Sequence, residues 1–216
     1  MKARYFGICG ALVLAALVAT LIALPHLPAK VPAHWNGHGQ VDGYGPRGSI
    51  FLWPGIMAGL LLVFAVLPWL SPKHFKVDTF ESTYLYLMLV CMSLVTYINA
   101  LTLWTQWSGH VNIVRAMIGG ISLFFALMGN VMGKVRRNFW VGIRTPWTLA
   151  NERVWNATHR FAAKTMVLAG VVGLIVALAS EQFWLWIGII LLGGLSPAFY
   201  SLVYYKRLER SGQLEI

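Results

Sequence analysis

The chain has 216 residues, of which 58% are hydrophobic and only 11% are charged. Soluble domains usually have about a quarter of their residues charged, so this composition excludes a soluble globular protein and indicates an integral membrane protein. The net charge of +10 does not call for a nucleic-acid partner, because anionic lipid headgroups attract basic residues at a membrane face.

Six apolar segments are long enough to cross a bilayer, since about 20 helical residues span its hydrocarbon core. The first follows Lys2 and Arg4, and its apolar stretch is longer than that of a cleaved signal peptide. A turn at residues 108–110 separates the third segment from the fourth. The predicted helices cover residues 5–24, 50–70, 83–105, 112–132, 161–180 and 183–205.

These helices predict an all-α fold, a six-transmembrane-helix bundle that forms a single membrane domain over residues 1–216. Residues 1–70 would form a first helical pair joined by an extracytoplasmic loop over residues 25–48. Residues 71–216 would form a four-helix part with a basic loop over residues 134–164. We find no internal repeat of the kind that marks many transporters.

The basic residues predict the orientation in the membrane. With the N-terminus inside, only Lys30, Arg47 and Arg115 would lie outside, and the other fourteen Lys and Arg residues would face the cytoplasm. This bias follows the positive-inside rule, so we predict a multi-pass protein of the bacterial inner membrane with both termini cytoplasmic. Cys9 and Cys91 fall within predicted spans, and no disulfide is expected.

The outer segment, residues 25–48, is rich in proline and glycine, which excludes regular helix through most of it and predicts a loop. Aromatic rings and polar groups alternate along this loop, and such a surface can bind a peptide at the outer face. The candidate ligand-binding residues are His34, Trp35, Asn36, Asp42 and Tyr44.

A metal site is the alternative for this loop. His34, His38 and Asp42 are spaced by four residues, would share one face of a helix, and are acceptable zinc ligands. Gly37 and Gly39 would break that helix, so we expect these side chains to hydrogen-bond the loop's own backbone. No metal and no other cofactor is predicted.

The cytoplasmic segment, residues 134–164, carries seven of the 17 Lys and Arg residues and cannot lie in hydrocarbon. Thr145–Pro146 predicts the start of a short helix over about residues 147–161. Its apolar strip is typical of a helix lying in the membrane interface, and the strip consists of Trp147, Val154, Trp155, Thr158 and Phe161. The simplest role for this segment is that of a positive-inside anchor.

Two sequence blocks carry a family resemblance. NFWVGIRTPWTLANERVWNATHR, at residues 138–160, resembles the signature of the SdpI family, bacterial immunity proteins against a secreted sporulation-delaying peptide toxin. LPAKVPAHWNGHGQVDGYG, at residues 27–45, resembles the extracytoplasmic domain-of-unknown-function segment that accompanies it. The resemblance implies a receptor that confers toxin resistance and draws a cytoplasmic repressor to the membrane. It implies that the following residues dock this partner: Asn138, Arg144, Thr145, Trp147, Glu152, Trp155, His159 and Arg160.

Catalysis is not predicted, because His159 and Glu152 are accompanied by no adjacent nucleophile. The resemblance thus implies a membrane-embedded immunity and signal-transduction protein whose partners are membrane lipids, a peptide toxin and a repressor-type protein. One alternative is a metal-dependent membrane enzyme that uses the His34, His38 and Asp42 cluster. The other is a small transporter, which the lack of a repeat and of paired acidic residues in the spans disfavours.

Overall fold

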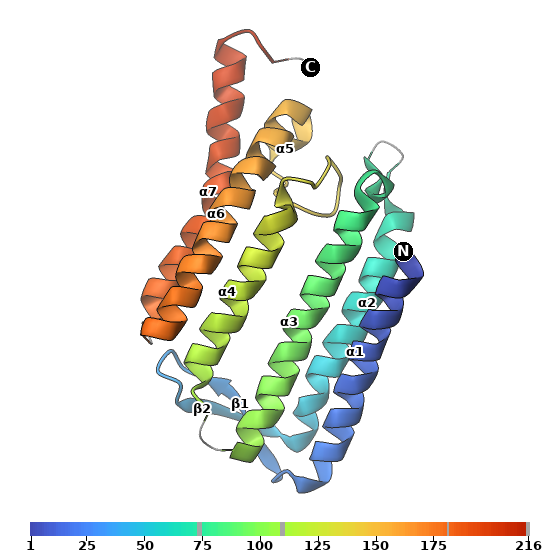
Figure 1. Cartoon of the computed structure of the whole chain (residues 1–216), viewed down its shortest axis with the longest axis vertical. Helices are drawn as coiled ribbons and strands as arrows, with labels where there is room; N and C mark the ends of the chain where they lie inside the picture. Colours follow the sequence, from blue (N-terminus) through green and yellow to red (C-terminus); the bar gives the residue numbers. More distant parts are fainter. Residues whose placement is uncertain (73–74, 109–110, 181, 215–216) are drawn as a thin grey trace.

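The computed structural model describes residues 1–72, 75–108, 111–180 and 182–214, and it shows an elongated helical bundle (Figure 1). Six helices in these ranges are long and apolar enough to cross a membrane. They are α1 (Lys2–Ala23), α2 (Leu52–Leu70), α3 (Glu81–Ser108), α4 (Ile113–Met132), α6 (Glu152–Ala179) and α7 (Phe183–Arg210). Between them lie the short helix α5 (Pro146–Ala150), the 3-10 helices η1 (Leu24–His26), η2 (Arg47–Phe51) and η4 (Val77–Phe80), and the strands β1 (Lys30–Trp35) and β2 (Val41–Pro46).

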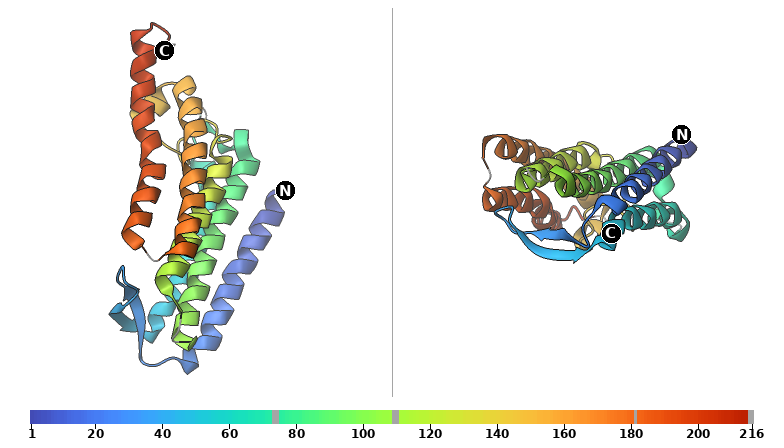
Figure 2. Two further views of the ribbon diagram at one scale, coloured as in Figure 1. Left: turned by 60° about the vertical axis from the view of Figure 1, so that its left-hand side comes forward. Right: turned by 90° about the horizontal axis from the view of Figure 1, so that it is seen from below.

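The helices pack as a chain of neighbours, with α1 and α2 on α3, α3 on α4, α4 on α6, and α6 on α7 (Figure 2). The backbones of α4 and α6 approach closely because glycines meet there. A Cβ on Gly170 would lie 2.6 Å from the Ser122 carbonyl oxygen, and one on Gly129 would lie 2.8 Å from the Val167 nitrogen. Small residues permit this packing in membranes, where no hydrophobic effect drives helices together.

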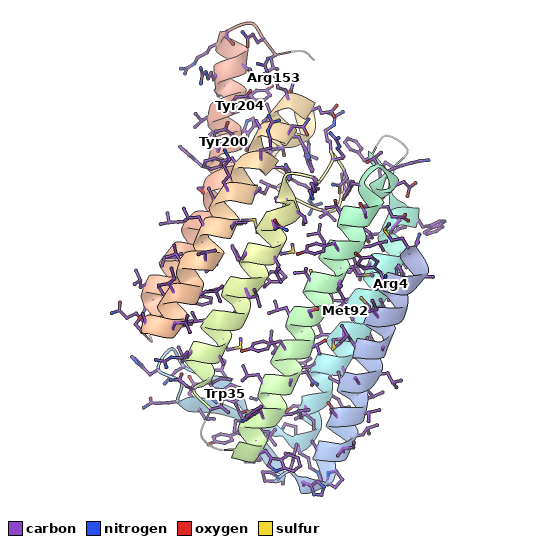
Figure 3. The ribbon with its side chains drawn as sticks, viewed as in Figure 1. Arg4, Trp35, Met92, Arg153, Tyr200 and Tyr204 are labelled. Carbon is purple, nitrogen blue, oxygen red and sulfur yellow. The ribbon has the colours of Figure 1, made fainter. Side chains whose placement is uncertain are left out.

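The two ends of the bundle differ (Figures 1 and 2). Both termini, α5 and the loop over residues 133–145 lie at one end, here called the loop end, and the strands lie at the other, the hairpin end. Figure 3 places Trp35 at the hairpin end, and Arg153 and Tyr204 at the loop end. The ribbon therefore puts the segments richest in Lys and Arg at one end, as six spans with a biased charge distribution require.

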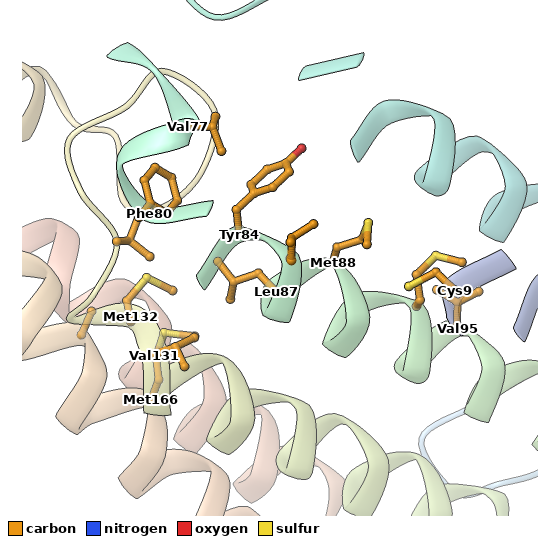
Figure 4. Close-up of a cluster of buried hydrophobic side chains, with 14 of the residues drawn as sticks. Cys9, Val77, Phe80, Tyr84, Leu87, Met88, Val95, Val131, Met132 and Met166 are labelled. Atoms are coloured by element: carbon orange, nitrogen blue, oxygen red, sulfur yellow. The ribbon is translucent and has the colours of Figure 1, made fainter. Parts of the chain in front are cut away.

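The largest buried cluster joins residues of α1, α2, η4, α3, α4 and α6, and methionines are prominent in it (Figure 4). Met88, Met132 and Met166 lie in this cluster with Phe80 and Tyr84. The Tyr84 hydroxyl donates a hydrogen bond to the Phe64 carbonyl oxygen at 2.7 Å, so the phenol is buried with its polar group satisfied.

The all-α six-span prediction is confirmed, although the helix bounds differ from those predicted. The largest difference is in α6, which begins at Glu152 and not at residue 161, and α7 continues to Arg210. Asn151 explains the early start of α6, because its side chain accepts a hydrogen bond from the backbone N–H of Val154 and caps the helix. The turn predicted at residues 108–110 depends on Gly109 and His110, which lie outside the described residues.

The outer loop predicted over residues 25–48 contains regular structure that was not predicted, because residues 30–46 form an antiparallel β-hairpin. Val31 pairs with Gly45 and Trp35 with Val41, with register irregularities around His34. The turn closes because Asn36 Oδ1 accepts hydrogen bonds from two backbone N–H groups, those of residues 38 (2.9 Å) and 40 (3.0 Å). Gly39 supplies the positive φ (76°) that this turn needs.

Candidate functional site

The loop over residues 133–145 is organised around Asn138, whose side chain is fully buried. Its Oδ1 atom accepts hydrogen bonds from the backbone N–H groups of Trp140 (2.8 Å) and Val141 (2.7 Å). Its Nδ2 atom donates to the carbonyl oxygens of Arg136 (2.8 Å) and Val141 (2.9 Å). The loop's own backbone thus occupies both ends of the amide, so Asn138 fixes the shape of the loop.

His159 holds the other side of this loop from α6. Its Nε2 atom accepts a hydrogen bond from the backbone N–H of Ile143 at 3.0 Å, and its Nδ1 atom lies 2.8 Å from the Trp155 carbonyl oxygen. Because the Ile143 amide is the donor, Nε2 carries no proton and Nδ1–H donates to Trp155, so the imidazole is neutral. The ring also stacks on the Trp155 indole, with 4.0 Å between the ring centroids.

Gly142 completes this contact. Its φ is +107°, a region that residues with a Cβ rarely adopt, and a Cβ at this position would overlap His159 Nε2. The glycine therefore lets the loop backbone lie directly against the imidazole. We call Asn138, Gly142, Trp155 and His159 together the loop-end node.

The short helix α5 is tied to both of its neighbours. Thr145 and Thr148 form a capping box at its N-terminus, in which the Thr148 N–H donates to Thr145 Oγ1 (3.2 Å) and the Thr145 N–H donates to Thr148 Oγ1 (2.9 Å). The Thr145 hydroxyl also lies 2.8 Å from that of Ser201 on α7. Asn151 then adopts an extended conformation that ends α5 and starts α6.

The helical structure predicted over residues 147–161 is formed, with a break at Asn151, and it continues into the fifth long helix. Its residues are divided between α5 and the first turns of α6, and much of the expected apolar strip packs inside the bundle. The Trp155 indole is fully buried and its Nε1–H donates to the Val135 carbonyl oxygen at 2.8 Å. Sequence periodicity could not distinguish a strip facing lipid from one facing other helices, because both are apolar. The buried members of the strip are Val154, Trp155 and Thr158.

Burial divides the residues predicted to dock a cytoplasmic partner. Asn138, Trp155 and His159 are inaccessible within the chain, and Thr145 and Trp147 are half-buried. Those that are exposed at the surface of the loop end are Arg144, Glu152 and Arg160. One guanidinium nitrogen of Arg144 donates to the Phe139 carbonyl oxygen, so this exposed side chain also braces the loop. Both ring nitrogens of His159 are engaged by backbone groups, so no His159–Glu152 pair forms.

At the hairpin end, His34 and Asp42 are brought together across the two strands, and His34 Nδ1 contacts a carboxylate oxygen of Asp42. Their proximity comes from strand pairing and not from the helical spacing considered for a metal site. Within the described ranges, no group of three or more His, Cys, Asp or Glu side chains could hold a metal ion. Tyr44 is 65% exposed, whereas Trp35 and Asn36 are half-buried.

His34, Trp35 and Asn36 line a cavity of about 430 Å³ between the hairpin and the helices. The walls come mainly from α3, α4 and α7, together with Trp53 of α2. The sequence had indicated the hairpin residues but not their partners on the helices, because no motif spans such distant segments. Aromatic residues near helix ends were the available signal. The most prominent of these partners are Trp53, Met117, Phe183, Trp186 and Ile187.

The fold and these two ends define an α-helical multi-pass membrane protein with a rigid loop at one end and a strand-capped cavity at the other. The pattern of the SdpI/YfhL protein family matches residues 134–204, and a Domain of unknown function (DUF1648) matches residues 11–58. The chain is 28% identical over 198 residues to the Immunity protein SdpI of Bacillus subtilis (strain 168), and this alignment covers 90% of the chain and 92% of the relative. No solved structure matches the chain.

Proposed function

We propose that this protein is a membrane immunity protein that protects its cell against a membrane-active peptide toxin. The observation that carries the proposal is the extent of the similarity to an immunity protein, which covers 90% of the chain. The family pattern covers the loop-end node, and the matched domain of unknown function covers the hairpin. A similarity confined to the helices would have reflected only the shared requirement for apolar spans.

The proposed orientation places the hairpin end outside the inner membrane and the loop end, with both termini, in the cytoplasm. The support is the distribution of charge, since only Lys30, Arg47 and Arg115 would then lie at the outer side. The hairpin is the first part of the protein that an external peptide meets. Its candidate ligand-binding residues are His34, Trp35, Asn36, Asp42 and Tyr44.

The proposed mode of action is binding and not catalysis. At the loop end, the polar side chains most deeply buried in the node hydrogen-bond to backbone groups, which is the expected pattern for a structural role. At the hairpin end, the polar pair His34–Asp42 is exposed and lies on strands that also carry Trp35 and Tyr44. Such a surface suits recognition of a peptide by hydrogen bonds and apolar contacts.

The loop end supports a second step, in which the immunity protein signals to a soluble cytoplasmic partner. Arg144, Glu152 and Arg160 are exposed around a node that fixes the loop backbone. A rigid backbone that presents charged side chains loses little conformational entropy when a partner binds. We therefore propose these three residues as the docking surface.

Expression in a toxin-sensitive bacterium tests the protective function. Cells that carry the protein should survive a dose of purified sporulation-delaying peptide that kills cells with an empty vector. Leu192→Trp, at a position on α7 that is 72% exposed, checks that a substitution on the outer face of a helix leaves protection and membrane abundance unchanged. If vector and wild-type cells are killed equally, although the wild-type protein is as abundant in the membrane as Leu192→Trp, the proposal is contradicted for that toxin class.

A further inference from the structure

The cavity at the hairpin end unites parts of the chain that are distant in sequence. Trp35 of β1 and Trp53 of α2 belong to the segment matched over residues 11–58, whereas Phe183, Trp186 and Ile187 of α7 belong to the segment matched over residues 134–204. Helices α3 and α4 complete the walls between them. The cavity therefore exists only when both matched segments fold together.

The hairpin is fitted closely to the helices around this cavity. A Cβ on Gly37 would lie 3.0 Å from Phe183 Cδ1, and a Cβ on Gly39 would lie 3.2 Å from Val114 Cγ2, so the tip of the hairpin rests on α7 and α4. Gln106 of α3 donates a hydrogen bond to the Pro32 carbonyl oxygen at 3.3 Å. These contacts hold β1 against the helices at one side of the cavity.

The chemistry of the lining selects an apolar occupant. Most of the wall is aliphatic or aromatic. His34, whose side chain is 73% exposed and contacts Asp42, also lines it, and the other polar groups are engaged within the protein. The Thr102 hydroxyl donates to the Ile98 carbonyl oxygen (2.8 Å), and the Trp186 indole N–H donates to Ser122 Oγ (2.9 Å). Asn36 Oδ1 accepts two backbone hydrogen bonds of the turn. A charged or sugar-like group would lose its hydration here without replacement, whereas a bulky apolar side chain would not.

The position of β1 indicates how such a side chain would arrive. Within the described residues the sheet has two strands, so β1 has a strand neighbour on one side only. The Pro32 carbonyl oxygen is taken by Gln106 and Pro32 has no N–H, so a peptide could pair with β1 only beyond Pro32. An extended peptide can pair with such an edge through backbone hydrogen bonds while alternate side chains enter a neighbouring pocket. The polar pair His34–Asp42 lies on the same strands, at the exposed surface.

We infer that this cavity is a socket for a bulky apolar side chain, aromatic or branched, of an extended peptide that binds along the hairpin. The inference rests on the proposed function in naming a peptide, and it deepens that function by assigning the chemistry of the recognised group. The volume of the cavity, about 430 Å³, lies within the usual range of ligand pockets.

The test fills the socket and measures binding directly. Ile187→Trp fills it from α7, and Met117→Trp fills it from α4, so that a folding failure of one variant does not remove the test. Leu192→Trp makes the same kind of change on an exposed face of α7. The full chain is placed in phosphatidylcholine nanodiscs, and saturation-transfer NMR measures the binding of N-acetyl-tryptophanamide, with N-acetyl-glutaminamide as the polar probe.

We expect the tryptophan probe to bind wild type and Leu192→Trp equally, and to bind both filled variants at least about tenfold more weakly, a difference of about 1.4 kcal/mol. The glutamine probe should give no saturable signal. Equal binding of the tryptophan probe to wild type and both filled variants would overturn the socket. Displacement of the probe by added phosphatidylglycerol would also overturn it, because the cavity would then be a lipid site.

The survival assay separates this inference from the proposed function. Filled variants that lose the probe yet protect cells fully would overturn the socket as the recognition site and leave the immunity function standing. If the wild-type protein binds the probe and the filled variants do not, but the wild-type protein protects no host, the proposed function is removed and the apolar chemistry of the socket is supported.

Discussion

Replacement of Gly142 by alanine should disrupt the loop-end node more than any other single methyl addition in the loop. The residue has φ of +107°, and its new Cβ would overlap His159 Nε2. Holding a non-glycine residue in that backbone region costs about 1–3 kcal/mol. If the loop moves instead, the hydrogen bond from Ile143 N–H to His159 Nε2 is lost, which costs about 1–3 kcal/mol for a buried unsatisfied group.

The two outcomes are alternatives, so the free energy of unfolding should fall by about 1–3 kcal/mol in either case. For a chain of this size the midpoint of thermal unfolding should then fall by about 2–12 °C. Gly133→Ala is the matched control, because Gly133 has φ of −66° and the nearest atoms to a new Cβ are at 3.7 Å. Thermal unfolding of both variants in the same detergent measures the difference.

A double-mutant cycle identifies the cause. If the clash with the imidazole dominates, Gly142→Ala should cost clearly less in a His159→Ala background than in wild type, because the overlapping atom is gone. Additive losses in the cycle would mean that the imidazole is not the obstacle. A midpoint for Gly142→Ala equal to that of Gly133→Ala would refute the reasoning about both the positive φ and the overlap.

Three further predictions concern orientation, the docking surface and a buried hydroxyl. A cysteine introduced at His38 should be labelled by a membrane-impermeant thiol reagent from outside the cell, and one introduced at Arg153 should be labelled only after permeabilisation. The reverse pattern would invert the topology. Arg144→Lys and Arg160→Lys should each impair signalling at normal membrane abundance, since lysine keeps the charge but loses the planar fork of donors; wild-type activity in both would reduce the loop to an anchor. Thr158→Val should raise the free energy of unfolding by about 1 kcal/mol in denaturant titrations, because Thr158 Oγ1 is buried with no hydrogen-bond partner in the described part of the chain, and a clear loss would show that the hydroxyl has a partner after all.

The helices and their order could be predicted from sequence because the membrane imposes one dominant requirement, a sufficiently long apolar run. The hairpin could not, because Pro32 and Gly43 lower the strand propensity of its segments and its register depends on packing against Val114 and Phe183. The start of α5 at Thr145 and Pro146 could be predicted from the sequence, since it depends on neighbouring residues.

The node shows where local reasoning stops. Sequence similarity pointed to Asn138 and His159, but it suggested partner docking, whereas both side chains are buried and bind backbone groups. The sequence block contains residues that shape the loop, but only the structure shows which groups they bind. Gly142, whose absent side chain makes room for the imidazole, belonged to the same sequence block, and only its φ and surroundings reveal its role.

The contacts of the hairpin have a mechanical consequence. Helices α4 and α6 interlock through their backbones at Gly129 and Gly170, whereas α3 meets α4 through side chains such as Tyr97, whose hydroxyl donates to the Ala116 carbonyl oxygen at 2.8 Å. The hairpin contacts the helices on both sides of the interface between α3 and α4. It binds α3 at Pro32, and its tip packs on α4 and α7. A change in the spacing of α3 and α4 would therefore have to bend the hairpin or break one of these contacts.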